Sequence, residues 1–255
     1  MKFNKLILLV LLAVLSVSCS DDDDDNNNNG QDTYLVTKIS MTNNSQDITI
    51  IEFTYDSQNR VISSIPNKSF DTPPCNYVYN SNGELTKFVL TFEDNSKREY
   101  NVTYRDSKNI EVHYMEDGIN RYDTYELNND GLLYKFTENP DGDDNTYLVF
   151  EYDSKGNVLK MTDEEGRYRK YTYDNNNGFL KDLTLPQWIT FYTIDILKTP
   201  NNRLTLEDYD KNDQLEDGTQ TYKYTYNEVG YPISYLYEYG PEKNNYKIGY
   251  KIVKK

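Results

Sequence analysis

FEYDSKGNV, at residues 150–158, is the clearest copy of a short pattern that recurs along the chain. The pattern is an aromatic residue, any residue, Tyr, Asp or Asn, two further residues, Gly or Asn, and then apolar residues. It returns as FTYDSQNRV at 53–61 and as YVYNSNGEL at 77–85. Successive copies lie about 24 residues apart, which indicates a repeat protein. Weaker copies centre on Tyr104, Leu127, Tyr173 and Tyr226.

Each copy has the residue preferences of a β-hairpin. Asp or Asn at the first turn position and Gly at the fourth suit a type I turn, because the short polar side chain bonds the backbone and Gly accepts a positive φ. A left-handed residue after such a turn gives a hairpin with a G1 bulge. In the flanking segments the residues alternate, with Tyr222 and Tyr224 on one face and Lys223 and Thr225 on the other. About seven or eight hairpins in succession predict a long antiparallel β-meander.

Composition and charge exclude several classes of protein. The only alanine, Ala13, lies in an N-terminal segment predicted to be removed, whereas all 26 tyrosines follow that segment. The mature chain therefore lacks the best helix former and is rich in a strand former, which argues against a helical bundle or a Rossmann-type fold. Removing Lys2 and Lys5 with the segment leaves 25 basic against 42 acidic residues, a net charge of −17. Phosphate binding needs a basic surface, so no nucleic acid partner is expected.

The N-terminus predicts export and a lipid anchor. Lys2 and Lys5 precede an apolar run at 6–17 that is short for a membrane span and ends in small residues, so residues 1–18 are predicted to be a signal peptide. SVSC at 16–19 resembles a bacterial lipobox, although serine stands at its first position where leucine is usual. The resemblance implies lipidation of Cys19, with a plain secretory signal as the alternative.

An acidic and asparagine-rich segment follows the cysteine. Residues 21–29 contain no apolar side chain, so 19–33 is predicted to be the lipidated cysteine and a solvated tether. The remaining residues, 34–255, are predicted to form a single β domain built from the repeats.

The repeat, the lipobox and the tether together resemble known families. Tyr-Asp-x-x-Gly followed by an apolar residue is similar to the YD repeat of RHS-type proteins over roughly residues 48–240. With its N-terminus, the chain resembles an uncharacterised family of Bacteroidetes-type surface lipoproteins with a porin-like β fold. The resemblance implies a large antiparallel sheet that curls on itself, but no established activity. An acidic run after a lipidated cysteine also implies an outer-membrane protein facing the cell exterior, with a periplasmic location as the alternative.

The predicted fold is all-β, a meander of repeated hairpins curled into a soluble, porin-like barrel that is either open or closed. A membrane-spanning barrel is the alternative, because its strands also alternate and have similar lengths. Charged residues such as Glu151, Lys160 and Lys223 stand in mid-strand, where a lipid-facing band would exclude them. The aromatic face is therefore expected to point inward.

No set of residues predicts catalysis, so the protein is not expected to be an enzyme and no cofactor is predicted. Asp56, Asp153 and Asp174 occupy the first turn position, where a carboxylate bonds the backbone. His113 is the only histidine and has no partner for a zinc site or a triad. Cys75 is the sole thiol left after lipidation of Cys19, and is expected to be shielded rather than nucleophilic.

Two acidic loops, 141–145 and 208–213, offer oxygen ligands but lack the glycine and the bidentate glutamate of an EF-hand. They are expected to be solvated hairpin loops, with calcium binding as the alternative; no metal site is predicted.

Residues 183–197 break the repeat and hold the only tryptophan. One interpretation is a strand pair that plugs or closes the sheet. The other is an aromatic patch for a sugar or a protein partner, with Trp188, Phe191 and Tyr192 as ligand contacts. The predicted function is therefore a lipid-anchored, non-enzymatic module that binds a glycan or an envelope protein. A structural scaffold within an outer-membrane complex is the alternative, and it should bury its aromatic residues and present open strand edges.

Overall fold

The computed structural model describes residues 32–43, 46–67, 72–142, 146–194 and 197–254. The predicted signal peptide, Cys19 and nearly all of the predicted tether lie outside the described residues. Within them, the chain forms sixteen β-strands and one α-helix. The elements are β1 (Thr33–Asn43), β2 (Gln46–Tyr55), β3 (Val61–Pro66), β4 (Cys75–Tyr79), β5 (Leu85–Thr91), β6 (Lys97–Tyr104), β7 (Asn109–Glu116), β8 (Ile119–Leu127), β9 (Leu133–Glu138), β10 (Thr146–Tyr152), β11 (Val158–Asp163), β12 (Tyr168–Tyr173), α1 (Gln187–Ile194), β13 (Arg203–Tyr209), β14 (Leu215–Tyr226), β15 (Pro232–Tyr239) and β16 (Glu242–Val253).

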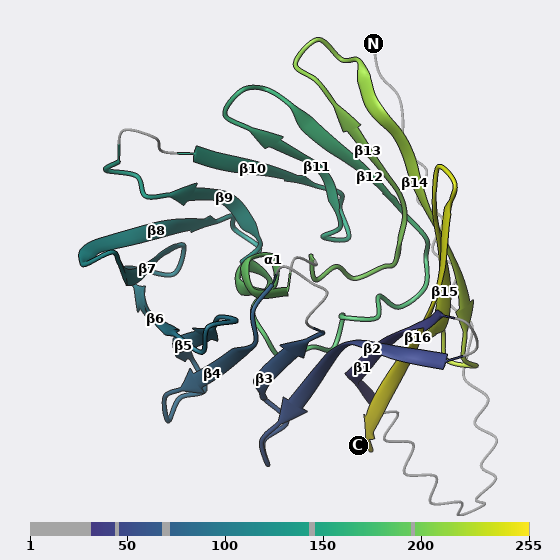
Figure 1. Ribbon diagram of the computed structural model, residues 1–255, viewed down its shortest axis with the longest axis horizontal. Helices are drawn as coiled ribbons and strands as arrows, with labels where there is room; N and C mark the ends of the chain where they lie inside the picture. Colours follow the sequence, from purple (N-terminus) through teal and green to yellow (C-terminus); the bar gives the residue numbers. More distant parts are fainter. Residues whose placement is uncertain (1–31, 44–45, 68–71, 143–145, 195–196, 255) are drawn as a thin grey trace, which may run out of the picture. The chain divides into compact units, whose positions relative to one another are not determined.

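The strands close into an antiparallel barrel. Each strand pairs with the next one along the chain, and β1 completes the ring by pairing with β16. This last pairing runs from Thr33 opposite Val253 to Thr42 opposite Asn245. Figure 1 shows the strands curling around α1. The predicted all-β meander is confirmed, and of the two forms left open by the sequence, the structure shows the closed barrel.

The predicted turn geometry is confirmed at the clearest repeat. The N–H of Gly156 donates to the carbonyl oxygen of Asp153 (3.1 Å), and the N–H of Asp153 donates to that of Asn157 (2.9 Å). Asp153 Oδ1 accepts the N–H groups of Lys155 and Asn157 at 2.8 and 2.9 Å. Gly156 has a φ of 91°, and the strand register shifts at Tyr152, as a G1 bulge requires. The same side-chain bonds to the second and fourth following residues recur at Asp56, Asn80, Asn128, Asp163, Asp210 and Asn227.

Asp153→Ala is expected to lower the free energy of unfolding by about 1–2 kcal/mol, because two backbone N–H groups lose a charged acceptor. Burial alone would raise the pKa of Asp153, but hydrogen bonds from Asn157 and the backbone hold it below its ordinary value. The stabilisation is therefore present at neutral pH and is lost as the pH falls below about 4. Urea denaturation of the wild type and the variant, at neutral pH and at a pH below about 4, measures this difference in stability. Ser154→Ala, in the same turn, is the control, and an equal loss in both variants would contradict the assignment.

One hairpin turn contains a long insertion, the plug segment, which comprises residues 174–202. Asp174 Oδ1 accepts the N–H of Asn176 (3.0 Å) and the N–H of Asn202 (3.1 Å). Asn202 thus makes the hydrogen bond that, in a short turn, comes from the fourth residue after the Asp, as Asn157 does to Asp153. The N–H of Asp174 also donates to the carbonyl oxygen of Asn202 (3.0 Å), as the first turn residue does elsewhere. The repeat is therefore not broken here; the plug segment is inserted into one of its turns.

The strand pair predicted for residues 183–197 is wrong, because α1 occupies Gln187–Ile194. Its residues are aromatic and β-branched, and they favour a strand on local grounds. However, every strand edge of the ring is already paired in the described barrel, so an inserted segment has to satisfy its own backbone. A helix does this within the segment, and Pro186 suits its start.

Aromatic contacts join α1 to one side of the barrel. Trp188 packs against Tyr125 of β8, with ring centroids 4.9 Å apart. Phe191 meets Phe136 of β9 and Phe150 of β10 at 6.3 and 5.7 Å. The buried core extends from α1 to this part of the wall and on to inward-facing residues of β1 to β7, β11 to β13 and β16.

Polar side chains of the plug segment accept hydrogen bonds from backbone N–H groups at or near the starts of strands. Thr184 Oγ1 accepts the N–H of Val61 at 3.0 Å, and Gln187 Oε1 accepts the N–H of Leu133 at 3.1 Å. Asp182 Oδ2 accepts the N–H of Tyr34 and the hydroxyl of Tyr231 at 2.8 and 2.7 Å. These bonds anchor the plug segment to three separate parts of the wall.

The outer face of the barrel carries ion pairs between neighbouring strands. Lys87 pairs with Glu99 at 2.8 Å, and Lys38 in the middle of β1 pairs with Glu52 of β2 at 3.5 Å. A lipid-facing surface excludes such charges from mid-strand positions, so these pairs support a water-facing wall. No helix among the described residues is long and apolar enough to cross a membrane.

Candidate binding site inside the barrel

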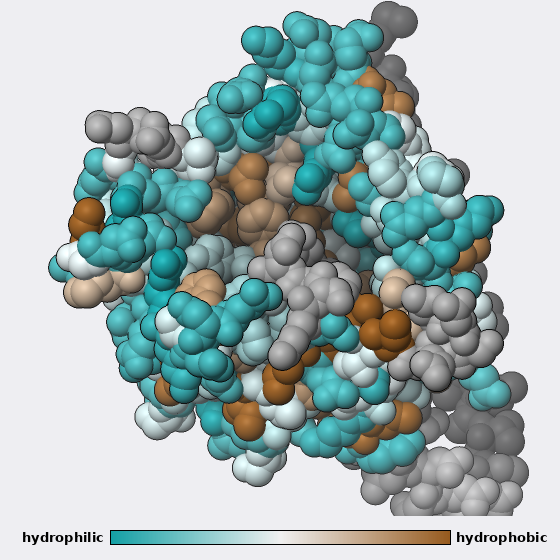
Figure 2. Space-filling view, viewed as in Figure 1, coloured by the Kyte–Doolittle hydropathy of each residue, from teal (hydrophilic) through white to brown (hydrophobic). Residues whose placement is uncertain are grey.

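A cavity of about 620 Å³ remains between the plug segment and the wall formed by β12 to β16. α1 fills the other side of the ring, so the apolar core stops short of β14 and β15. Figure 2 shows a face hollowed within the ring of strands, with hydrophobic side chains inside the hollow and hydrophilic ones around it. The cavity wall holds seven tyrosines: Tyr171, Tyr173, Tyr222, Tyr224, Tyr235, Tyr237 and Tyr246.

Strand register places these tyrosines beside one another. Tyr222 lies opposite Tyr237, and Tyr224 lies opposite Tyr235, with ring centroids 5.4 Å apart in both pairs. Tyr235 stacks on Tyr246 of β16 at 4.5 Å. The alternation read from the sequence thus turns one face of β14 and β15 into a continuous aromatic wall.

The hydroxyl groups of this wall stay protonated at neutral pH. Burial raises the pKa of Tyr237 to about 12 and raises that of Tyr235 further above its ordinary value. Each ring therefore offers an apolar face together with a hydroxyl that donates and accepts hydrogen bonds.

Arg203 brings a positive charge into this aromatic cavity. It is the first residue of β13, and its guanidinium carbon lies 4.6 Å from the ring centre of Tyr222. Nη2 donates to the hydroxyl of Tyr222 at 2.7 Å, and that hydroxyl donates to Gln220 Oε1 at 3.1 Å. Chemically, the arrangement can hold a ligand that combines ring faces, hydroxyl groups and negative charge.

The three predicted ligand contacts all lie on α1, in contact with the wall. Trp188 is 3% exposed, so it packs in the core and does not form an exposed aromatic patch. Tyr192 meets Phe88 and Tyr100 at 5.8 and 5.7 Å. Phe191 is half-buried and lines a second concavity of about 460 Å³. A ligand contact of Phe191 or Tyr192 stays a prediction.

His113 and Cys75 have ordinary structural surroundings. His113 Nε2 lies 2.9 Å from Glu111 Oε2, and its ring stacks on Tyr122 at 5.5 Å. Cys75 begins β4 and is fully buried, and burial raises the pKa of its thiol to about 12. A thiol with this pKa is not a nucleophile at neutral pH.

Carboxylates of the acidic loops bond their own surroundings. Asp208 pairs with Arg169 at 2.6 Å, and Asp213 accepts the hydroxyl of Tyr168 at 2.6 Å. Asp141 accepts the hydroxyl of Tyr122 at 2.9 Å, while residues 143–145 of that loop lie outside the described part. Across the described ranges, no group of three or more His, Cys, Asp or Glu side chains has the geometry to hold a metal ion.

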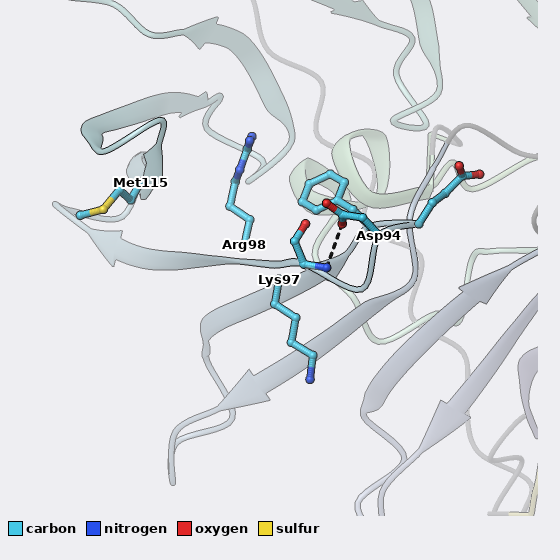
Figure 3. A pocket seen from close by; sticks show the side chains of 7 residues that line it. Asp94, Lys97, Arg98 and Met115 are labelled. Carbon is cyan, nitrogen blue, oxygen red and sulfur yellow. Dashed lines mark hydrogen bonds between the residues drawn. The ribbon is translucent and has the colours of Figure 1, made fainter.

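Another concavity, of about 610 Å³, lies at the turn between β5 and β6. Figure 3 shows Lys97 and Arg98 pointing to opposite sides of the strand, with Met115 pointing away from both. Asp94 accepts the N–H of Ser96 at 2.8 Å, as a turn residue does, and Arg98 pairs with Glu116 at 2.8 Å. The polar groups of this concavity do not converge on one point, so it is a weaker candidate for a binding site than the tyrosine-lined cavity.

These features define a closed antiparallel barrel with an internal plug and an aromatic cavity. Residues 152–186 match the RHS Repeat family, which confirms the predicted YD-type repeat over that stretch. No curated protein matches the chain at a significant level.

Solved structures that are similar in fold include two porin-like proteins. A porin-like protein from Bacteroides vulgatus has 11% identity and a TM-score of 0.42, and the match covers 86% of this chain and 99% of that one. A porin-like protein from Bacteroides uniformis has 14% identity and a TM-score of 0.38, with 86% and 98% covered.

Proposed function

We propose that the protein is a lipid-anchored, non-enzymatic envelope protein whose barrel binds a glycan in the tyrosine-lined cavity. The observation that carries the proposal is the wall of Tyr222, Tyr224, Tyr235 and Tyr237, which faces a space large enough for a small ligand. Sugars bind to such surfaces through ring faces packed on aromatic rings and through hydroxyl hydrogen bonds. Lipidation of Cys19 would hold this domain at the outer membrane, facing the cell exterior.

A concave cavity suits a saccharide better than a folded protein. Stable protein interfaces bury roughly 1,200–2,000 Å² of accessible surface, whereas this site is recessed within the ring of strands. The rival role, a structural scaffold, calls for open strand edges, and the strands described here pair into a complete ring.

Thermal unfolding in the presence of soluble polysaccharides tests the proposal, because a ligand that binds only the folded state raises the midpoint. We expect a rise with at least one class of glycan. Tyr237→Ala should abolish that rise. Tyr134→Ala, which removes a 49% exposed tyrosine outside the cavity, should leave it unchanged.

A well-folded protein that shows no shift with any polysaccharide would overturn glycan binding and direct the search to envelope proteins. A shift that survives Tyr237→Ala and is lost in Tyr134→Ala would place the site elsewhere on the barrel.

A further inference from the structure

We propose that the cavity selects an acidic saccharide, and that Arg203 binds the carboxylate of a uronic-acid type sugar. The inference rests on the proposed glycan-binding function and adds the charge class of the ligand. It depends on the one cationic side chain in the tyrosine-lined wall, and on what surrounds it.

The guanidinium of Arg203 has unused hydrogen-bonding capacity. An arginine carries five N–H donors in a fork that fits a carboxylate, and Nη2 of Arg203 uses one of them on the hydroxyl of Tyr222. Within the described residues no carboxylate forms an ion pair with Arg203. Asp208, on the same strand, is 2.6 Å from Arg169 and is paired there.

The cavity compensates this charge only with aromatic rings and hydroxyl groups. The guanidinium carbon lies 4.6 Å from the ring centre of Tyr222 and 5.9 Å from that of Tyr171. Contacts with aromatic rings stabilise a cation. They compensate the lost hydration of a half-buried guanidinium less fully than a bound anion would. A carboxylate entering the cavity would therefore gain more from Arg203 than a neutral hydroxyl would.

The other charge near the cavity does not cancel this preference. Glu242 lies on the rim at the start of β16, where it is exposed and accepts a hydrogen bond from Asn244 Nδ2 at 2.5 Å. Its repulsion of an anion is screened by water and salt, whereas a contact with half-buried Arg203 is screened less.

Calorimetric titration of the protein with two matched probes tests the inference. The probes are an oligogalacturonate and the same oligomer with its carboxylates methyl-esterified, so ring faces and hydroxyl groups are shared, while the ester lacks the charge and carries one added methyl group on each carboxylate. We expect the acidic probe to bind at least about 10-fold more tightly. Arg203→Gln should remove that preference, and Arg203→Lys should restore only part of it because lysine lacks the fork.

Arg105→Gln is the matched control, because it removes the same charge from an exposed site that pairs with Glu111. It should keep the preference. Should Arg203→Gln fail to fold, Arg203→Lys serves as the second variant, because it keeps the charge and loses the fork; a preference undiminished in Arg203→Lys would contradict the assignment.

The outcomes separate the two proposals. Equal affinity for both probes, unchanged in Arg203→Gln, would overturn the acidic preference and leave glycan binding in place. Binding of neither these probes nor any other glycan would overturn both.

Discussion

Trp188→Ala is expected to lower the free energy of unfolding by about 3–5 kcal/mol, the usual cost of truncating a buried tryptophan. Trp188 is 3% exposed, and its ring lies against Tyr125 on the wall. Truncation leaves an apolar void between α1 and β8, and a closed ring of paired strands cannot collapse to fill it. Urea denaturation followed by far-ultraviolet circular dichroism measures the loss, since removing the only tryptophan also removes its fluorescence.

Two variants calibrate this result. Trp188→Phe keeps much of the ring and should cost clearly less than the alanine variant. Leu215→Ala removes a side chain that is 45% exposed and should change the stability by no more than about 0.5 kcal/mol. A Trp188→Ala protein as stable as the wild type would show that α1 is not packed in the core.

Asp123→Asn is expected to raise the free energy of unfolding at neutral pH by about 2 kcal/mol. Asp123 is 1% exposed, and burial raises the pKa of its carboxyl to about 6. It accepts the N–H of Asn139 at 3.1 Å and the hydroxyl of Tyr114 at 3.3 Å. In the described part of the chain no cationic side chain forms an ion pair with it, so ionisation is costly in the folded state.

The sign of the pH effect follows from the raised pKa. The folded protein holds this proton up to about pH 6, whereas the unfolded chain releases it near pH 4. The stability that depends on Asp123 therefore falls as the pH rises through this window and stays low above it.

Thermal unfolding at two pH values measures the effect. The midpoint of thermal unfolding of Asp123→Asn should be higher than that of the wild type at about pH 7.5 and equal to it at about pH 3.5. Asp130→Asn, in an exposed turn, should match the wild type at both. If Asp123→Asn were no more stable at the higher pH, the carboxylate would be solvated in the folded protein.

The hairpins could be predicted from the sequence because their causes are local. Asp153, the left-handed position at Gly156 and the alternating side chains lie within a few residues of each other, and the same bonds recur in copy after copy. The closure of the barrel has no such signal, since it depends on the twist accumulated over all strands and on a pairing between the two ends of the domain. α1 was mispredicted because the enclosing barrel overrides the strand preference of its residues.

The candidate site was only partly visible in the sequence. Alternation placed Tyr222 and Tyr224 on one face, but nothing distinguished them from the other tyrosines, because the cavity exists only where the plug segment fails to fill the ring. Trp188 attracted attention by its rarity, yet it is a core residue. Arg203 was missed; its one sequence signal is a basic residue at the start of β13, between two strands, β12 and β14, in which tyrosines alternate with other residues.

The seam between β1 and β16 sets an order for folding. In the described barrel every other strand pair joins consecutive strands, and all of these except β12 and β13, which the plug segment separates, form across short loops at a low entropic cost of loop closure. The seam joins Thr33 to Val253 and cannot form until the end of the chain is available. Until β16 is available, β1 therefore has an unpaired edge that is open to other chains, and a chain that lacks β16 would keep that edge permanently.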